Sequence, residues 1–383
     1  MTKLNVIYLC NSVFPSERAN SVHVMKMSQA FSKQTRSYQL IGLANGNPSP
    51  SELFQYYDTE AFDLKLFRYL RVPRILDICA WRASRMVKRS LVDLVYSRFT
   101  KGSRRTSQLG IPTVHEIHAD IWNKNAEHEA LLNEIVYGPG TLGIVAISEG
   151  LKRAFQAKYP DFDESRIFVA HDGADPQDLS QLRKEQNPKF RIGYLGSLNE
   201  GRGIEIIEGL ANRLADKNFE FHILGGSKQE VEHWSSRFPD TAHFHGYVPH
   251  CDVKQHISQL DVCLMPYQKR ILTGSNSLDT AQYTSPLKMF EYMSLRKTII
   301  SSNLPVLQEV LNEKNSILVD PKDLSAWESA VVRLAEDSLL REQLAQQALD
   351  DFNTEFSWHK RVERILGWCS DLLAAKQQGG VKH

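Results

Sequence analysis

The sequence predicts an α/β protein with two doubly wound domains, and three observations support this prediction. Short apolar runs recur along the chain, each followed by a polar or glycine-bearing turn and usually by a helical pattern. Continuous apolar strands that alternate with helices are typical of parallel sheets covered on both faces. The runs also fall into two sets of six, separated by the polar stretch DLSQLRKEQNPK at residues 178–189. We therefore expect two domains that face a cleft, with ligands at the carboxyl ends of the strands.

The apolar runs place the predicted strands. In the first half they lie at residues 4–10, 38–44, 91–97, 113–118, 143–148 and 166–171. In the second half they lie at residues 190–197, 219–226, 243–248, 262–267, 297–303 and 316–320. From residue 323 onward the pattern is amphipathic and predicts helices up to a short polar tail.

Composition and charge exclude several classes of protein. The 383 residues suit two domains of ordinary size, and a formal net charge of +1 gives no reason to expect a polyanion partner. The five cysteines are odd in number and form no CxxC pair, which argues for a reducing compartment and against a zinc knuckle. The apolar start is too short for a signal peptide, and no run approaches the roughly 20 apolar residues of a membrane-spanning helix. We expect a cytoplasmic protein.

The loop after the strand at 190–197 has the features of a phosphate site. Apolar residues after Gly203 share one helical face, so a helix is expected to start there, and Gly201 and Gly203 leave its backbone uncovered. A helix amino terminus presents unpaired N–H groups and a partial positive charge. Arg202 adds a planar fork suited to phosphate. The alternative is a plain strand-to-helix turn with an exposed arginine.

The stretch TSPLKMFEYM at residues 284–293 predicts a second helix amino terminus of this kind. Ser285 is expected to cap the helix, with Pro286 as its first residue. Lys288 places a positive charge in the first turn, which is unfavourable for the helix unless an anion binds there. Glu291 can accept two hydrogen bonds, as a clamp for the vicinal hydroxyls of a sugar would. The alternative is a solvated lysine and a surface glutamate.

At this point the chain resembles a family 4 retaining glycosyltransferase of the GT-B fold, in an SPLK-type subgroup. The resemblance spans most of the chain and is densest in the second half, in GYLGSLNEGRGIEII, FHILGG, HFHGYVPHCDVKQHISQLDVCLMPY and SPLKMFEYMSLRKTIISSNLPVLQEVL. In the first half it rests on PSERANSVHVMKMSQAF, VHEIHAD, VAISEGLKRAF and VAHDGAD. The fold it implies has an acceptor domain at residues 1–185 and a nucleotide-sugar domain at residues 186–356. A last helix at about 357–378 crosses back to the first domain.

The resemblance assigns donor-binding roles within the second half. Glu291 matches the second acid of the family's E-x7-E motif, which holds the ribose of the donor nucleotide. Ser285, Pro286 and Leu287 match the loop whose backbone amides meet the donor. Arg202 stands where a basic residue contacts the diphosphate. A UDP- or GDP-sugar is therefore the implied donor.

Five further positions are assigned in the same way. Gly196 matches the turn under the diphosphate. Tyr247 and Val248 match the segment that flanks the base. Asn20 and Ser21 stand where many members have a glycine-rich loop close to donor and acceptor.

The sequence departs from the family pattern at three places. Tyr283 occupies the position of the first motif acid, which in the family approaches the sugar. The first-domain loop lacks a Gly-Gly pair. Ser197 stands where the family often has an arginine, which leaves Arg202 and Lys288 to neutralise the diphosphate.

The implied chemistry stabilises a leaving group. Departure of a nucleoside diphosphate builds negative charge on its oxygens, which helix termini, Arg202 and Lys288 would stabilise. His118 matches a histidine near the transferred sugar. No metal is expected, because alternation on a strand puts Glu116 and His118 on one face and His115 on the other, which is poor geometry for chelation.

A basic stretch covers residues 65–105, with twelve Lys or Arg against two acids and several interleaved apolar residues. Such a stretch is suited to an anionic membrane surface. No nucleic-acid motif accompanies it, so no nucleic-acid partner is expected. The alternative is a solvated face balanced by acids elsewhere in the fold.

These observations predict a metal-independent, retaining glycosyltransferase of the hexosyltransferase type. It would transfer a sugar from a UDP- or GDP-sugar to a glycan or lipid-linked acceptor, in bacterial surface polysaccharide synthesis and peripheral to the inner face of the plasma membrane. One alternative is a nucleotide-sugar 2-epimerase of the same fold. The other is a non-catalytic, glycosyltransferase-like partner, suggested by Tyr283 and the missing glycines.

Overall fold

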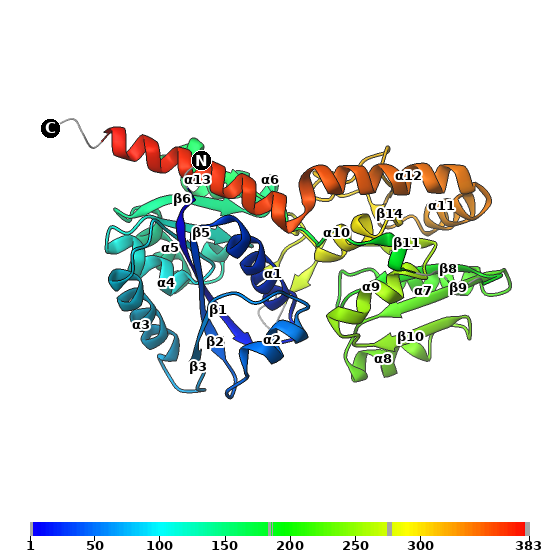
Figure 1. The fold of residues 1–383 in the computed structure, drawn as a ribbon. Helices are drawn as coiled ribbons and strands as arrows, with labels where there is room; N and C mark the ends of the chain where they lie inside the picture. The colour runs from blue at the N-terminus through cyan, green and yellow to red at the C-terminus, as the bar shows by residue number, and fades with distance from the viewer. Residues whose placement is uncertain (1–2, 183–184, 186, 274–277, 380–383) are drawn as a thin grey trace. The chain divides into compact units, whose positions relative to one another are not determined.

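The computed structural model describes residues 3–182, 185, 187–273 and 278–379 (Figure 1). The chain forms two compact units. Unit 1 combines Met1–Asp172 with Trp358–His383, and unit 2 is Gly173–Ser357. The two units therefore meet in the chain between Asp172 and Gly173, whereas the boundary expected from the sequence was residue 185.

Unit 1 contains a seven-stranded sheet with the order β3-β2-β1-β4-β5-β6-β7, in which every paired strand is parallel. Its strands are β1 (Asn5–Phe14), β2 (Ser37–Ala44), β3 (Leu64–Arg68), β4 (Leu94–Ser97), β5 (Thr113–Ile117), β6 (Thr141–Ala146) and β7 (Ile167–Val169). Its helices are α1 (Ala19–Gln34), α2 (Pro50–Tyr56), α3 (Ile75–Arg89), α4 (Thr100–Gln108), α5 (Ala126–Val136), α6 (Glu149–Lys158) and α13 (Trp358–Gly379). All six strands predicted for the first half are present.

The additional strand β3 was not predicted. It forms the edge of the sheet and pairs only with β2. Phe67 is its one buried side chain, and Lys65 and Arg68 are exposed. An edge strand that buries so little has a weak apolar pattern, and here the cations of the basic stretch obscure it.

Unit 2 contains a six-stranded parallel sheet with the order β10-β9-β8-β11-β14-β15. Its strands are β8 (Phe190–Leu195), β9 (Phe219–Leu224), β10 (Ala242–Gly246), β11 (Val262–Met265), β14 (Thr298–Ser302) and β15 (Ile317–Val319). Two short strands, β12 (Leu272–Thr273) and β13 (Leu278–Asp279), form a separate antiparallel pair. Its helices are α7 (Ile204–Arg213), α8 (Lys228–Ser235), α9 (His250–Ser258), α10 (Leu287–Ser294), α11 (Leu324–Glu336) and α12 (Ser338–Asp351). The predicted α/β class with two parallel sheets is confirmed.

Both sheets reverse their strand order at one point, between β1 and β4 in unit 1 and between β8 and β11 in unit 2. In doubly wound sheets, ligands bind at the carboxyl ends of the strands beside this switch point, because the flanking loops diverge to opposite faces there. In unit 2 the relevant segments are those that follow β8 and β11.

Apolar clusters on both faces of the unit 2 sheet hold these segments in place. One cluster includes Met289, Phe290 and Met293 of α10. The other includes Ile204 of α7 and Trp327 of α11. Buried apolar residues of α7 and α10 therefore help to anchor the amino ends of these helices.

The last helix, α13, belongs to unit 1. It packs against α1 and β6. A Cβ on Gly143 of β6 would lie 2.5 Å from Cη2 of Trp368, so the absence of a side chain there lets the helix approach the sheet. Neither α13 nor any other helix in the described part of the chain is both long and apolar enough to cross a membrane.

Candidate functional site

Two cations meet at the switch point of unit 2. Lys288 on α10 is buried, and its Nζ lies 3.8 Å from the ring centroid of Tyr194 and 5.0 Å from that of Tyr267. Arg202, from the segment after β8, places its Cζ 5.2 Å from the centroid of the same Tyr267 ring. Tyr267 follows β11, so the structure brings together side chains from β8, from α10 and from the segments that follow β8 and β11.

Neither cation is fully satisfied within the protein. Among the described residues, Lys288 Nζ and Arg202 Nε have no hydrogen-bond partner. Burial, aided by the nearby charge of Arg202 and opposed by Glu291, holds the pKa of Lys288 well below its usual value. A buried ammonium without a counter-charge is costly, so this arrangement favours binding of an anion.

The backbone of Gly196 lies beside the Lys288 ammonium. Its φ of 141° places it in a backbone region that side chains rarely adopt, directly after β8. A Cβ at this position would lie 2.9 Å from Lys288 Nζ. The neighbouring Ser197 accepts a hydrogen bond on its carbonyl oxygen from the Tyr194 hydroxyl at 2.7 Å, which fixes the turn. Gly196, Ser197, Arg202 and Lys288 are thus brought together.

The amino end of α10 differs by one residue from the prediction. Pro286, predicted as the first helical residue, is the N-cap with φ −79° and ψ 125°, and the helix begins at Leu287. Ser285, predicted as the cap, is buried one residue earlier. A Ser-Pro pair does not fix this boundary, because the proline ring sets φ but leaves ψ free. Among the described residues, no side chain caps the first N–H groups of α10, so these donors can bind a ligand.

The glycines of the Arg202 loop have a different role from the one expected. Gly201 and Gly203 have φ near 80°, in the left-handed region. A Cβ on Gly201 would lie 2.0 Å from the carbonyl oxygen of Arg270, and one on Gly203 would lie 1.8 Å from that of Pro266. Both therefore let the loop pack against the segment after β11 instead of leaving it uncovered. The helix start predicted near Gly203 is confirmed, since Gly203 is the N-cap of α7.

Glu291 lies one turn into α10, near the start of α9. Its Oε1 is 3.7 Å from Nδ1 of His250, the first residue of α9. Tyr247 and Val248 lie just before this helix and its N-cap Pro249. Tyr247 is 44% exposed, and Val248 packs on the core. His250 thereby joins the Glu291 region to the Tyr247 segment. His250 was not among the predicted site residues, although it directly follows Tyr247, Val248 and Pro249 in the sequence.

Tyr283, at the position of the expected first acid, lies in a turn before α10. Its N–H donates to the carbonyl oxygen of Thr280 at 3.0 Å, and its side chain is half-buried.

In unit 1, Asn20 and Ser21 lie in the first turn of α1 and not in a loop. They still follow the carboxyl end of β1, beside the switch point. Ser21 is buried and donates from its hydroxyl to Oδ1 of the exposed Asn20 at 3.3 Å.

His118 directly follows β5 and belongs to a buried polar network. Its Nε2 is 2.8 Å from Oε1 of Glu116. Burial and the charge of Arg98 lower its pKa to about 4, although Glu116 opposes this. His118 is therefore a neutral imidazole at neutral pH.

Glu116 is the centre of this network. Arg361 of α13 donates from Nη2 to Glu116 Oε1 at 2.8 Å, and the Tyr96 hydroxyl donates to Oε2 at 2.6 Å. His23 lies between Glu116, at 3.3 Å, and Asp172, at 2.9 Å. His23, Glu116 and His118 are close enough to suggest a metal site, but Arg361 already supplies the positive charge that Glu116 needs. Burial would raise the pKa of Glu116, but Arg361 and the histidines outweigh it and hold the pKa well below its usual value.

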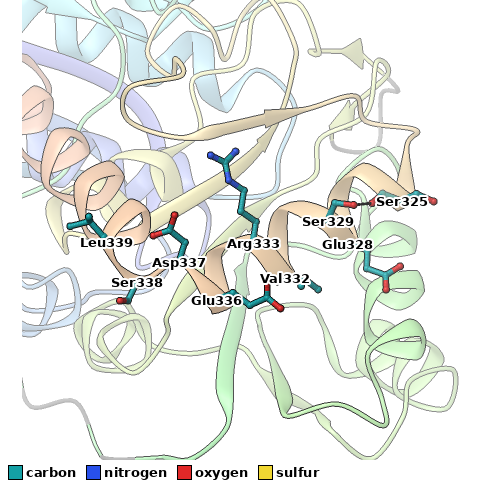
Figure 2. A pocket seen from close by; sticks show the side chains of 9 residues that line it. All are labelled: Ser325, Glu328, Ser329, Val332, Arg333, Glu336, Asp337, Ser338 and Leu339. Atoms are coloured by element: carbon teal, nitrogen blue, oxygen red, sulfur yellow. Dashed lines mark hydrogen bonds between the residues drawn. The ribbon is translucent and has the colours of Figure 1, made fainter.

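A separate hollow lies along α11 and the start of α12 (Figure 2). Its lining residues are Ser325, Glu328, Ser329, Val332, Arg333, Glu336, Asp337, Ser338 and Leu339. None of them is a predicted site residue, and Glu328 is paired with Arg213 at 3.2 Å and Lys217 at 3.4 Å. We assign no chemistry to this hollow.

Comparison with known structures gives the class of fold. Anabaena HepE in complex with UDP and glucose superposes with a TM-score of 0.70 at 15% identity, covering 96% of this chain and 99% of that one. A glycosyltransferase from Rickettsia africae ESF-5 gives 0.72 at 12% identity, covering 97% and 99%. Sucrose-phosphate synthase from Thermosynechococcus elongatus gives 0.69 at 14% identity, covering 97% and 100%. The chain is thus an α/β protein of the GT-B fold, as predicted.

A family comparison adds the class of enzyme. Residues 189–337 match the model of Glycosyl transferases group 1. The chain therefore carries a glycosyltransferase group 1 domain, and the prediction of a glycosyltransferase is confirmed at this level. No curated protein matches the sequence.

Proposed function

We propose that this protein is a retaining, family 4-type glycosyltransferase that transfers a hexose from a UDP- or GDP-sugar to a glycan or lipid-linked acceptor. The observation that carries the proposal is the incompletely satisfied cation pair, Lys288 and Arg202, beside the open amino end of α10. The proposed setting is bacterial surface polysaccharide synthesis on the cytoplasmic side of the membrane.

The donor site follows from the chemistry of unit 2. A diphosphate at Gly196 would give the buried Lys288 a counter-charge and could accept hydrogen bonds from the N–H groups of Leu287 and Lys288. Glu291, with His250 at 3.7 Å, offers carboxylate oxygens to ribose hydroxyls. The exposed Tyr247 ring offers a surface on which a base can stack. UDP is the first nucleotide to test, because Anabaena HepE is in complex with UDP and glucose.

Transfer would proceed by stabilising the leaving group. As the bond between the sugar and the diphosphate breaks, negative charge grows on the leaving oxygen, and Arg202, Lys288 and the α10 amides would stabilise it. The departing phosphate can accept the proton of the acceptor hydroxyl on the same face of the sugar. This pathway needs no metal and no covalent carboxylate nucleophile.

The acceptor would be bound by unit 1. His118 is neutral, is oriented by Glu116 and is about one quarter exposed, so it can hydrogen-bond a sugar hydroxyl without adding charge. Asn20 and Ser21 follow the carboxyl end of β1 and would contact the donor sugar and the acceptor. We call His118 catalytic only in this sense of contact with substrate.

The alternative functions can be separated by product analysis. A nucleotide-sugar 2-epimerase would convert UDP-N-acetylglucosamine into its epimer without an acceptor. A non-catalytic partner would bind no nucleotide. A transferase releases UDP only as its sugar reaches an acceptor or water.

We predict that UDP will raise the thermal unfolding temperature of the protein and that Glu291→Gln will reduce this effect. Loss of the hydrogen bonds that the ribose hydroxyls would donate to the charged carboxylate should weaken UDP binding by roughly tenfold or more, because such bonds contribute about 1.5–3 kcal/mol. Differential scanning fluorimetry with UDP, GDP and ADP would measure the shift in unfolding temperature, and titration calorimetry would measure the affinity for UDP.

The matched control is Glu313→Gln, an exposed glutamate of the same unit, which should bind UDP like the wild type. Equal affinity in Glu291→Gln and wild type would contradict the ribose assignment. Failure to bind any nucleotide would favour the non-catalytic partner.

We further propose that the helices α3 and α4 contact an anionic membrane surface. They line a hollow that includes Trp81, Arg85, Lys88, Arg89 and Arg105. Trp81 is 45% exposed, and Leu91, just after α3, is 94% exposed. Part of the basic stretch is neutralised, since Lys101 pairs with Asp77 at 2.8 Å, but the hollow keeps cations and apolar side chains side by side.

Vesicle sedimentation should show binding to liposomes with anionic lipid and none to neutral liposomes. The double substitution Arg85→Glu and Arg89→Glu should weaken binding at least tenfold, because each cation contributes about 1 kcal/mol at such a surface. Added salt should have the same effect. The control is Lys314→Glu, an exposed cation of unit 2. The assignment to α3 and α4 would be refuted if added salt did not weaken liposome binding. It would also be refuted if Lys314→Glu weakened binding as much as the double substitution does.

A further inference from the structure

The edge of the unit 2 sheet carries a cluster of histidines to which the proposed donor site assigns no role. Glu220 and His222 are two positions apart on β9, and His243 and His245 are two positions apart on β10. The parallel register pairs His243 with His222, so all four side chains lie on one face of the two strands. The sequence signal is HFH at residues 243–245 with EFH at 220–222, which the sequence analysis did not use.

The side chains converge on one point. His222 Nε2 lies 3.8 Å from Glu220 Oε2, and His243 Nε2 lies 4.0 Å from Glu220 Oε1. One ligand atom from each of Glu220, His222 and His243 falls within 4.8 Å of the others. Donor atoms of a tetrahedral zinc ion at about 2.0–2.1 Å lie roughly 3.4 Å apart, so small rotations of the side chains would close the site.

His222 is prepared to act as a ligand. Its Nδ1 is engaged with Nε2 of His245 at 3.1 Å, which orients the ring as outer hydrogen bonds orient metal-bound histidines. Its Nε2 is buried and has no hydrogen-bond partner among the described residues. His243, by contrast, has 45% of its side chain exposed and gives access from solvent.

We propose that Glu220, His222 and His243 form a binding site for one zinc-like divalent transition metal ion, with His245 orienting His222. The site is independent of the proposed sugar transfer. A bound ion would tie the edge strand β10 to β9 and so stabilise the segment that leads to Tyr247.

The neighbouring charges decide which ions fit. Lys189 Nζ lies 3.4 Å and Arg191 Nε 3.7 Å from Glu220, and the amide of Asn187 donates to Glu220 at 3.0 Å. The Glu220 carboxylate therefore already interacts with these three side chains. The imidazoles must supply most of the affinity for a metal ion. Imidazole ligands suit zinc, nickel and copper, whereas calcium and magnesium require several oxygen ligands. We expect zinc to bind and calcium and magnesium not to.

The test uses the full chain purified without a histidine tag and stripped with a chelator. Equilibrium dialysis against Zn²⁺, with metal analysis, should give one ion per chain, and Zn²⁺ should raise the unfolding temperature. His243→Gln, at an exposed position where folding is not at risk, should weaken binding at least tenfold. His222→Gln should do the same, while His233→Gln, an exposed histidine of the same unit, should bind like the wild type.

Spectroscopy separates this site from the His23, Glu116 and His118 cluster of unit 1. Cu²⁺ bound at the proposed site should show nitrogen hyperfine structure that is lost in the double variant His222→Gln and His243→Gln and kept in His118→Gln. Loss in His118→Gln instead, the same affinity in His243→Gln as in the wild type, or no saturable binding at one ion per chain would overturn the proposal.

Discussion

Replacing Arg202 by alanine should lower kcat for sugar transfer by about 10²–10³-fold, the range seen when one preorganised donor to a developing negative charge is removed. Arg202 is held beside Lys288 by the shared Tyr267 ring, so its charge is in place before the reaction begins. The KM for the donor should change less, because charge on the leaving oxygen grows mainly in the transition state. Steady-state release of UDP would measure both constants.

Two variants make this experiment specific. Arg202→Lys keeps the charge but loses the planar fork, so it should fall between wild type and Arg202→Ala. Arg237→Ala removes an arginine of the same unit that stacks on Trp234 and pairs with Glu208, and it should leave kcat unchanged. Full activity in a folded, UDP-binding Arg202→Ala would refute leaving-group stabilisation by this residue.

Arg361→Met should destabilise unit 1 by about 3–5 kcal/mol, the usual cost of removing one partner from a buried ion pair. Glu116 and Arg361 have side chains only 0% and 2% exposed, so water cannot replace the lost charge. The change also removes hydrogen bonds from Arg361 to the carbonyl oxygens of Ala170 and His171. Urea denaturation, with hydrogen exchange to locate the effect in unit 1, would measure the loss.

The control on the same helix is Arg364→Met. Arg364 is exposed and lies over Phe168 at 5.7 Å, so its loss should cost less than about 1 kcal/mol. The double variant Arg361→Met and Glu116→Gln should recover part of the loss, because no unpaired charge stays buried. A cost of Arg361→Met no larger than that of Arg364→Met would show that the pair does not stabilise unit 1.

The same pair predicts a dependence on pH. Because the pKa of Glu116 is lowered in the folded protein, its contribution is present above the unfolded value of about 4.3 and is lost as the pH falls toward the folded value. In Arg361→Met this pKa should rise, so the variant should lose less of its remaining stability between pH 5 and pH 3.

The fold was largely predictable because buried parallel strands are continuous apolar runs. The runs at 190–197 and 262–267 were recognised for this reason, and β8 and β11 lie within them. The edge strand β3 escaped prediction because it buries only Phe67 and lies among cations. Helix ends such as Pro286 depend on one ψ angle, which the surrounding packing sets.

The candidate site was predictable where local chemistry was unusual. A lysine in the first turn of an apolar helix pointed to an anion, and Lys288 does lie buried beside Arg202. The tyrosines that hold both cations, Tyr194 and Tyr267, looked like ordinary strand residues. The Glu116 network could not be predicted either, since Arg361 lies 245 positions away along the chain.

The placement of Arg361 in unit 1 has a consequence for how the chain matures on the ribosome. Unit 2 is continuous from Gly173 to Ser357, so it can fold as soon as it is synthesised. Unit 1 begins first, yet the partner that neutralises Glu116 arrives only with the final helix. The segment made first therefore completes its folding last, and until then Glu116 lacks its cation and α1 and β6 lack the helix that packs against them.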